Sequence, residues 1–228
     1  MKRIDLANPV LRSREKAYSE FRYPTTERTF LPQPTVLPKT QFSKVLASRE
    51  SRRDFNSLPR RNLNSLLWHS ARAIEVNQPA RSSRWQHRPA ASAGGRHPID
   101  ILIIERNRDQ PTLHVYQPEA HALAKIRLAS GSLLEDFLDS IDNVVNTDHA
   151  TIVWLAAQFD RTLSRYENGE SLVWRDSGVL IATIGLVAEC LDLNCCAVGI
   201  TGEPFISALL KSKSKVVGVG GILIGRRN

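Results

Sequence analysis

A loop-to-strand stretch near the middle of the chain reads RPAASAGGRHPIDILII (residues 88–104). Its adjacent glycines, Gly94 and Gly95, allow a ligand to approach the backbone closely, and the small side chains around them leave room for a flat ring. The apolar run at residues 99–104 is rich in β-branched side chains, which is typical of a β-strand. From the residues alone, a simple turn and a ligand-binding loop explain the glycine segment equally well.

The segments around this stretch indicate a mixture of strands and helices. Further strands are predicted at residues 113–116, 151–157, 195–200 and 216–224. Two short helices are expected on either side of residues 49–61. Residues 178–191 are apolar on every side, so a helix there must be buried in a core or at a subunit interface. Because strands and helices do not alternate strictly, we predict an α+β fold rather than a doubly wound parallel sheet.

The length of 228 residues is sufficient for one globular domain with an appended arm. Residues 1–40 hold five of the twelve prolines and show no sustained period, so we expect an extended N-terminal arm followed by a folded domain at 41–228. Residues 75–88 are polar and aperiodic, which indicates a loop. The most apolar run, residues 178–188, is too short to cross a bilayer, and we expect a soluble, cytoplasmic protein without a membrane partner.

The net charge of +8 raises the question of nucleic-acid binding. The arginines cluster in two segments: Arg49, Arg52, Arg53, Arg60 and Arg61, then Arg81, Arg84, Arg88 and Arg96. No zinc-finger spacing, aromatic RNA-binding strand or GXXG loop accompanies them, which argues against a nucleic-acid partner. A compact phosphate ligand explains part of the charge. The three cysteines show neither a disulfide framework nor metal-ligand spacing, so no metal site is predicted.

The first arginine cluster contains RESRRDF (residues 49–55). Arg49 and Arg53 are four residues apart with Ser51 between them. On one helical face, these three side chains could make charge-assisted hydrogen bonds to the phosphate of flavin mononucleotide (FMN). Taken alone, a solvated basic helix end is the simpler interpretation.

Taken together, the segments resemble those of nitroreductase-like flavoproteins. Residues 49–55 resemble the family's R-R-S-x-R-x-F opening, with Glu50 at a position that is commonly basic. Residues 88–98 resemble the R-T-x-P-S-A-G-G-L-Y-P segment of SagB-type dehydrogenases, with Ala91 replacing proline and Arg96-His97 replacing Leu-Tyr. Residues 113–123 are similar to the hairpin L-Y-x-Y-x-P-x-x-H-x-L. Residues 161–178 are similar to R-x-x-x-K-Y-G-x-R-x-Y-R followed by a glycine-opened helix, and residues 191–200 to L-G-L-x-x-C-A-I-G.

The resemblance implies a central mixed or antiparallel sheet flanked by helices, with FMN at the interface of a homodimer. His121 fits the family hairpin and is expected to have a structural role. The apolar helix at 178–191 and the proline-rich arm would contact the partner subunit. The implied FMN-binding residues are Arg49, Ser51 and Arg53 at the phosphate and ribityl chain, Ser92, Ala93, Gly94 and Gly95 along the cofactor, Val198, Gly199 and Ile200 at the ring, and Arg226 near the phosphate.

Arg165 and Tyr166 are the candidate catalytic residues. Azoline-oxidising relatives are expected to carry Lys-Tyr at this place. A desolvated lysine can lose its proton whereas an arginine effectively cannot, so Arg165 is a poor general base. Tyr166 either donates and accepts a proton or packs as an aromatic ring beside the cofactor.

Three functions remain open at this stage. The motifs favour FMN-dependent dehydrogenation of a peptide-derived or other natural-product substrate. The second is reduction of quinone or nitro compounds; without a G-x-G-x-x-G loop, NAD(P)H would bind only transiently over the flavin as electron donor. The third is an accessory subunit that has kept the fold, suggested by the departures at Ala91, Arg96, His97 and Arg165.

Overall fold

The computed structural model describes residues 7–35, 38–77, 85–106, 110–128, 130–213 and 215–227. Within them, seven strands form one sheet in the order β10-β11-β8-β5-β6-β7-β2, and every neighbouring pair is antiparallel. The strands are β2 (Thr25–Phe30), β5 (Ile99–Glu105), β6 (Thr112–Gln117), β7 (Ala122–Ile126), β8 (Thr151–Ala157), β10 (Leu193–Val198) and β11 (Val217–Arg226).

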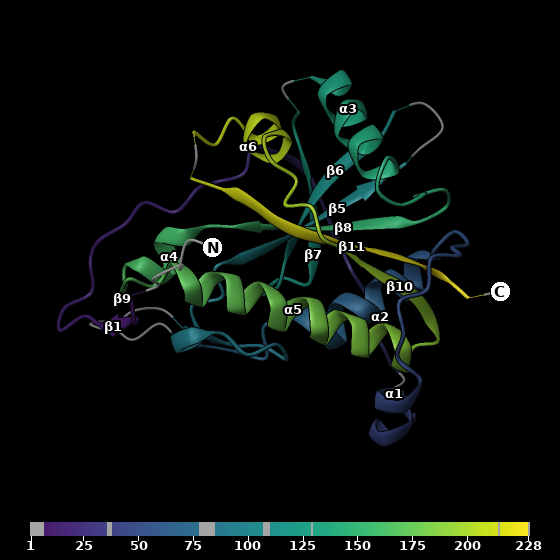
Figure 1. Ribbon diagram of the computed structural model, residues 1–228, viewed down its shortest axis with the longest axis horizontal. Helices are drawn as coiled ribbons and strands as arrows, with labels where there is room; N and C mark the ends of the chain where they lie inside the picture. Colours follow the sequence, from purple (N-terminus) through teal and green to yellow (C-terminus); the bar gives the residue numbers. More distant parts are fainter. Residues whose placement is uncertain are drawn as a thin grey trace, which may run out of the picture.

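Helices cover both faces of the sheet (Figure 1). One face carries α2 (Arg60–Ala71) and α5 (Glu170–Cys190), and the other carries α3 (Gly131–Asp142) and α6 (Phe205–Leu210). Because side chains alternate along a strand, neighbouring residues enter different apolar clusters: Ile222 packs on the α2 and α5 side, and Leu223 on the α3 and α6 side. Two short helices, α1 (Phe42–Ser48) and α4 (Phe159–Leu163), lie near the two ends of α5.

The predicted α+β class is confirmed, with a wholly antiparallel main sheet. The five predicted strands correspond to β5, β6, β8, β10 and β11, and the helices expected around the first arginine cluster are α1 and α2. The predicted arm contributes β2 to the edge of the sheet, and β1 (Val10–Leu11) pairs with β9 (Tyr166–Glu167). Every residue of β2 is exposed, so no hydrophobic period marked it in the sequence.

The sequence predicts a loop at residues 75–88, and this prediction is wrong for the first and the last residues of the segment, which form strands. There β3 (Glu75–Asn77) pairs with β4 (Trp85–His87) as an antiparallel ribbon. The ribbon is polar and lies outside the main sheet, which explains why it shows no apolar alternation. Arg81 and Arg84 of the second arginine cluster lie outside the described residues.

Helix α5 extends well beyond the apolar run that predicted it. By length and composition alone, its 21 residues would suffice to cross a membrane, a test that the core helix of a globular domain also passes. It packs against α2, β10 and β11. Its opposite face is open: Trp174 and Val179 are 47% and 39% exposed. Within one chain, therefore, only one face of this apolar helix is covered.

Candidate functional site

The first group of predicted site residues lies beside the C-terminal half of α5. Helix α1 ends at Ser48, and Arg49 leaves it with an extended backbone (φ −59°, ψ 118°). The Arg52 amide then donates to the Cys195 carbonyl at the edge strand β10 (3.0 Å). The prediction that Arg49 and Arg53 share one helical face is therefore wrong, because the segment follows the sheet edge instead of continuing the helix.

Arg49 and Ser51 line a cavity of about 390 Å³ between this segment, α5 and β10. Its walls include Ile181 and Gly185 of α5 and Ala197 of β10. Among the described residues, the side chains of Arg49 and Arg53 have no hydrogen-bond or ion-pair partner, and both residues are exposed. Two guanidinium groups are thus available to an external anion.

Two neighbouring arginines are already occupied by a buried carboxylate. Glu189 lines the cavity with its side chain 6% exposed, and it accepts hydrogen bonds from Arg52 (2.5 Å) and Arg227 (2.9 Å). Burial acts to raise the pKa of Glu189, but hydrogen bonds from Ser48 and Arg52 and the charge of Arg227 outweigh burial and lower the pKa. Glu189 therefore stays ionised and holds both arginines against the end of α5.

Arg226 and the end of β10 lie at the same side of the sheet. The backbone of Arg226 pairs with Asn56 in both directions, which ties the chain end to the basic segment. The side chain of Val198 is buried in the α3 and α6 cluster, and Gly199 is exposed. The Val198 side chain is therefore directed away from the cavity. Ile200 packs against the same cluster.

The second group of predicted residues lies at the N-terminal half of α5. Ser92 Oγ donates to Asp176 Oδ2 (2.6 Å), and the Ala93 amide donates to Asp176 Oδ1 (3.2 Å). Gly94 and Gly95 both have left-handed backbones (φ +60° and +63°), which side chains rarely adopt. The carboxylate thus holds the loop against the helix. Burial raises the pKa of Asp176, although the hydrogen bonds from Ser92 and Ala93 oppose this.

Tyr166 joins this second group. A Cβ at Gly94 would lie 2.8 Å from Tyr166 Oη, so the hydroxyl lies directly over the glycine. The β1–β9 pairing holds Tyr166 opposite Leu11, and the carbonyl of Arg165 accepts a hydrogen bond from the Arg12 amide (3.0 Å). The N-terminal segment therefore positions the candidate catalytic pair.

The two groups are not brought together within one chain. Asp176 and Glu189, which mark their positions on α5, are thirteen residues apart, or about 20 Å along a helix. Figure 1 shows β9 near the start of α5 and α1 near its end. Within one chain, the two groups therefore lie near opposite ends of α5.

His121 has the structural role expected of it. It is buried, and its ring nitrogens contact Tyr116 Oη (2.8 Å) and Asn64 Oδ1 (2.5 Å). A neutral ring with the proton on Nε2 satisfies both contacts, because Asn64 Oδ1 can only accept. The network connects α2 to the β6–β7 hairpin.

The sequence profile of the Nitroreductase family matches residues 25–226. The chain belongs to the nitroreductase family. Members of this family are FMN-dependent oxidoreductases. The predicted resemblance and the predicted class of enzyme are thereby confirmed at the level of the family.

Solved structures show the same fold at low sequence identity. A nitroreductase-type protein from Ralstonia eutropha JMP134 has a TM-score of 0.61 and 18% identity, covering 94% of this chain and 98% of its own. A chain of the Escherichia coli microcin synthetase McbBCD complex, with truncated pro-MccB17 bound, has a TM-score of 0.57 and 16% identity. The match covers 89% of this chain and 79% of that chain. An FMN-bound nitroreductase from Bacteroides fragilis NCTC 9343 has a TM-score of 0.50 and 14% identity. The match covers 83% of this chain and 90% of that chain. The comparison with curated proteins gave no match.

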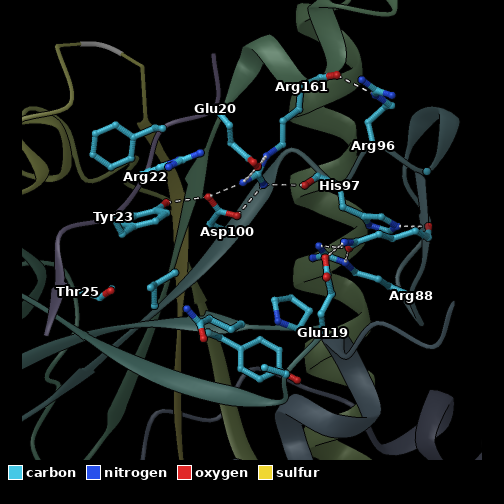
Figure 2. Close-up of a pocket in the computed structure, with 18 of the residues that line it drawn as sticks. Glu20, Arg22, Tyr23, Thr25, Arg88, Arg96, His97, Asp100, Glu119 and Arg161 are labelled. Carbon is cyan, nitrogen blue, oxygen red and sulfur yellow. Dashed lines mark hydrogen bonds and ion pairs between the residues drawn. The ribbon is translucent and has the colours of Figure 1, made fainter. Parts of the chain in front are cut away.

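A further cavity of about 540 Å³ lies behind the glycine loop of this nitroreductase-family chain (Figure 2). A partly buried ion-pair network forms one wall: Arg161 Nη1 donates to Asp100 Oδ1 (2.7 Å), and Arg161 Nε donates to Glu20 Oε1 (2.7 Å). Tyr23 Oη also donates to Asp100 (2.8 Å). Burial and the Asp100 charge hold the pKa of Tyr23 well above its usual value.

Sequence reasoning missed this network. Its one signal was Asp100, a carboxylate inside the apolar, β-branched run of residues 99–104. A charge in such a strand requires a partner, but nothing in the sequence indicates that the partner is Arg161, 61 residues away.

Proposed function

We propose that this chain is an FMN-dependent dehydrogenase of the SagB-like kind, acting on a peptide-derived or other natural-product substrate. The observation that carries the proposal is the loop from Ser92 to Gly95, held on Asp176 with Tyr166 Oη over Gly94. A proton-bearing hydroxyl beside an exposed glycine backbone supports a role of this loop at the cofactor. The bound pro-MccB17 of the structurally similar microcin synthetase complex is in keeping with a peptide-derived substrate.

The residues present fit FMN. Arg49 and Ser51 offer a guanidinium group and a hydroxyl at the cavity of about 390 Å³, and Arg53, exposed in the same segment, offers a second unpartnered guanidinium group. Gly94 and Gly95 offer backbone without side chains. When bound, FMN supplies the redox chemistry by taking a hydride equivalent from one substrate and passing electrons to another. The protein binds and orients the reactants.

A homodimer would complete the site. In this arrangement, the exposed apolar face of α5 packs on the partner, and the glycine loop of one chain meets the basic segment of the other. We further propose that the dimer is cytoplasmic, with a small-molecule or peptide-derived substrate and with neither a membrane nor a nucleic acid as partner.

The proposed role of Tyr166 is proton transfer at the substrate atom that becomes unsaturated. Arg165 stays protonated and serves as a fixed positive charge beside it, in the place where a lysine base is expected in azoline-oxidising relatives. The same substitution favours a second candidate function, NAD(P)H-dependent reduction of quinone or nitro compounds, since that reaction does not require a lysine base.

The test of cofactor binding is the visible absorption of the purified protein before and after addition of FMN. We expect flavin absorption to persist through gel filtration in the wild type and in the control Arg61→Ala, whose side chain is exposed on α2. Arg49→Ala and Arg53→Ala should each weaken FMN binding at least tenfold. A colourless wild type that cannot be reconstituted contradicts the proposal and favours an accessory subunit.

The test of Tyr166 is Tyr166→Phe. The variant should keep its flavin and lose about 100-fold in the turnover of a dehydrogenation substrate, the usual effect of removing a proton-transfer group. Unchanged turnover would assign Tyr166 to packing alone.

A further inference from the structure

The cavity behind the glycine loop is distinct from the cavity at Arg49. Its walls come from five regions: the N-terminal segment with β2, the stretch from β4 to the glycine loop, the start of β5, the β6–β7 turn, and α4. Its volume of about 540 Å³ is in the range of small-molecule sites. Figure 2 shows Arg22 and Thr25 on the opposite side of the cavity from Arg88 and Glu119.

Most polar groups on these walls already bind one another. Asp100 is shared by Arg161, Tyr23 and Gln158. Among the remaining lining groups, Arg96 binds Ser164 (2.9 Å) and Glu15. Gln86 is the centre of the other contacts: its carbonyl binds His97 Nε2 (2.9 Å), and its side chain accepts from Arg88 and donates to Glu119. These groups shape the cavity, but their hydrogen bonds are largely used internally.

Two of the lining tyrosines have their hydroxyls engaged in the same way. The hydroxyl of Tyr23 binds Asp100 and that of Tyr116 binds His121. Tyr116 is buried, so of these two side chains it is Tyr23 that offers a ligand ring surface. Phe21, which packs edge-on against Tyr23 with ring centroids 5.2 Å apart, and Val115 add to this apolar wall.

The uncommitted charges at the cavity are positive. Arg22 and Arg28 are exposed, and their side chains have no hydrogen-bond or ion-pair partner among the described residues. Five arginines and three carboxylates line the cavity in all, so its balance is also positive. Guanidinium groups match the planar, bidentate geometry of a carboxylate.

From this combination we propose that the cavity binds a small organic anion with a planar apolar body, of which an aromatic carboxylate is the simplest example. The carboxylate binds Arg22 and Arg28, and the ring packs against Tyr23, Phe21 and Val115. The site does not depend on flavin. Because Gly95 and His97 line it, an occupant lies against the back of the loop whose Ser92 is held by Asp176.

The test is ¹⁹F NMR titration of 4-fluorobenzoate into the protein as purified, with 4-fluorobenzamide as the uncharged probe. We expect saturable binding of the acid and at least tenfold weaker binding of the amide. The double variant Arg22→Gln/Arg28→Gln should weaken binding of the acid at least tenfold. The matched control is Arg127→Gln, an exposed arginine outside this cavity, and it should bind as the wild type does.

Two further measurements distinguish the alternatives. Flavin absorption recorded in the same titration should not change; a change that survives in the double variant would place the probe at the flavin and overturn the proposal. Inorganic phosphate and unlabelled benzoate are each added as competitors of 4-fluorobenzoate. If phosphate displaces the probe as effectively as benzoate does, the cavity recognises charge alone, which contradicts the proposed contact with the apolar wall. Absence of saturable binding to the wild type overturns the site altogether.

Discussion

Asp176 on α5 and Ser92 on the glycine loop are 84 residues apart in the chain and are joined by a hydrogen bond of 2.6 Å. The bond is one of a set: Asp176 also accepts from the Ala93 amide, and Ser92 Oγ accepts from the His97 amide (2.9 Å). The Asp176 carboxylate thus fixes the start of the loop, and the Ser92 hydroxyl fixes its end at His97. The two glycines between them have left-handed backbones. The geometry of the proposed cofactor loop therefore depends on a helix residue that was not among the predicted site residues.

Removing this hydroxyl should loosen the loop. In Ser92→Ala, Asp176 loses a donor and the His97 amide loses an acceptor, so we expect a loss of about 2 kcal/mol in the free energy of unfolding. FMN affinity should fall several-fold. Urea unfolding and flavin-fluorescence titration measure the two effects. The control Ser171→Ala removes only an exposed contact with Arg175 and should change neither.

Gly94→Ala tests the close approach of Tyr166. The new Cβ would lie 2.8 Å from Tyr166 Oη. The alanine would also have to keep the left-handed backbone of Gly94, and this conformation alone costs about 1–2 kcal/mol. We expect lower stability and loss of turnover. Gly131→Ala provides the comparison, because a Cβ there meets its nearest neighbour, Gln110, at 3.9 Å. The same stability and turnover in Gly94→Ala as in Gly131→Ala would contradict the loop geometry described for Gly94 and Tyr166.

The elements that could be predicted from the sequence are those with a strong apolar pattern. Strand β8 is buried along nearly its whole length and matches its predicted bounds, whereas β2 is exposed throughout and left no signal. The spacing of Arg49 and Arg53 fits a helix, yet the chain there hydrogen-bonds to the edge of β10. A local pattern cannot reveal such a tertiary contact.

The candidate site shows the same limit. Motif resemblance identified Ser92 and Tyr166 as site residues, but not that they lie at the opposite end of α5 from Arg49. Arg22 gave no signal, because an isolated arginine in a proline-rich segment looks like solvated surface. Its significance arises only where the N-terminal segment folds against the β6–β7 turn and closes a cavity.

Glu189→Gln should change stability and FMN affinity in opposite directions. The buried carboxylate compensates Arg52 and Arg227, so its neutralisation should cost about 1–3 kcal/mol in the free energy of unfolding. It also places a negative charge on the wall of the Arg49 cavity, and its removal should tighten FMN binding several-fold. Unfolding and flavin titration at low ionic strength are the measurements. A fall in both quantities would mean that Glu189 mainly orients the two arginines.

Two buried histidines predict a loss of stability in weak acid. Burial lowers the pKa of His97 and of His121 to about 4, whereas an unfolded histidine titrates near pH 6.5. Between these values the unfolded chain binds protons that the folded chain does not, so the free energy of unfolding decreases as the pH falls from about 6.5 to about 4. Urea unfolding across this range should show a shallower decline for His121→Gln than for the wild type. His87→Gln, at an exposed position, should keep the wild-type slope.

The exposed face of α5 predicts how the dimer can be broken. Ala182 is exposed on the same face as Val179, in the half of α5 nearer the Arg49 cavity. In a monomer, Ala182→Glu is a surface substitution that changes the free energy of unfolding by less than about 0.5 kcal/mol. In a dimer it buries a charge in an apolar contact. We therefore expect gel filtration with light scattering to show a dimer for the wild type and a monomer for Ala182→Glu.

A monomer also separates the Arg49 segment from the Ser92 loop and should lose flavin. Because Ala182 itself lines the Arg49 cavity, the subunit state measured by light scattering, rather than flavin loss, is the decisive result. The control Ser132→Glu places the same charge on α3, on the opposite face of the sheet, and should remain dimeric and yellow. A variant Ala182→Glu that stays dimeric and keeps FMN would place the subunit interface elsewhere. A monomeric wild type that holds FMN would show that one chain suffices, against the separation of the two groups of residues along α5.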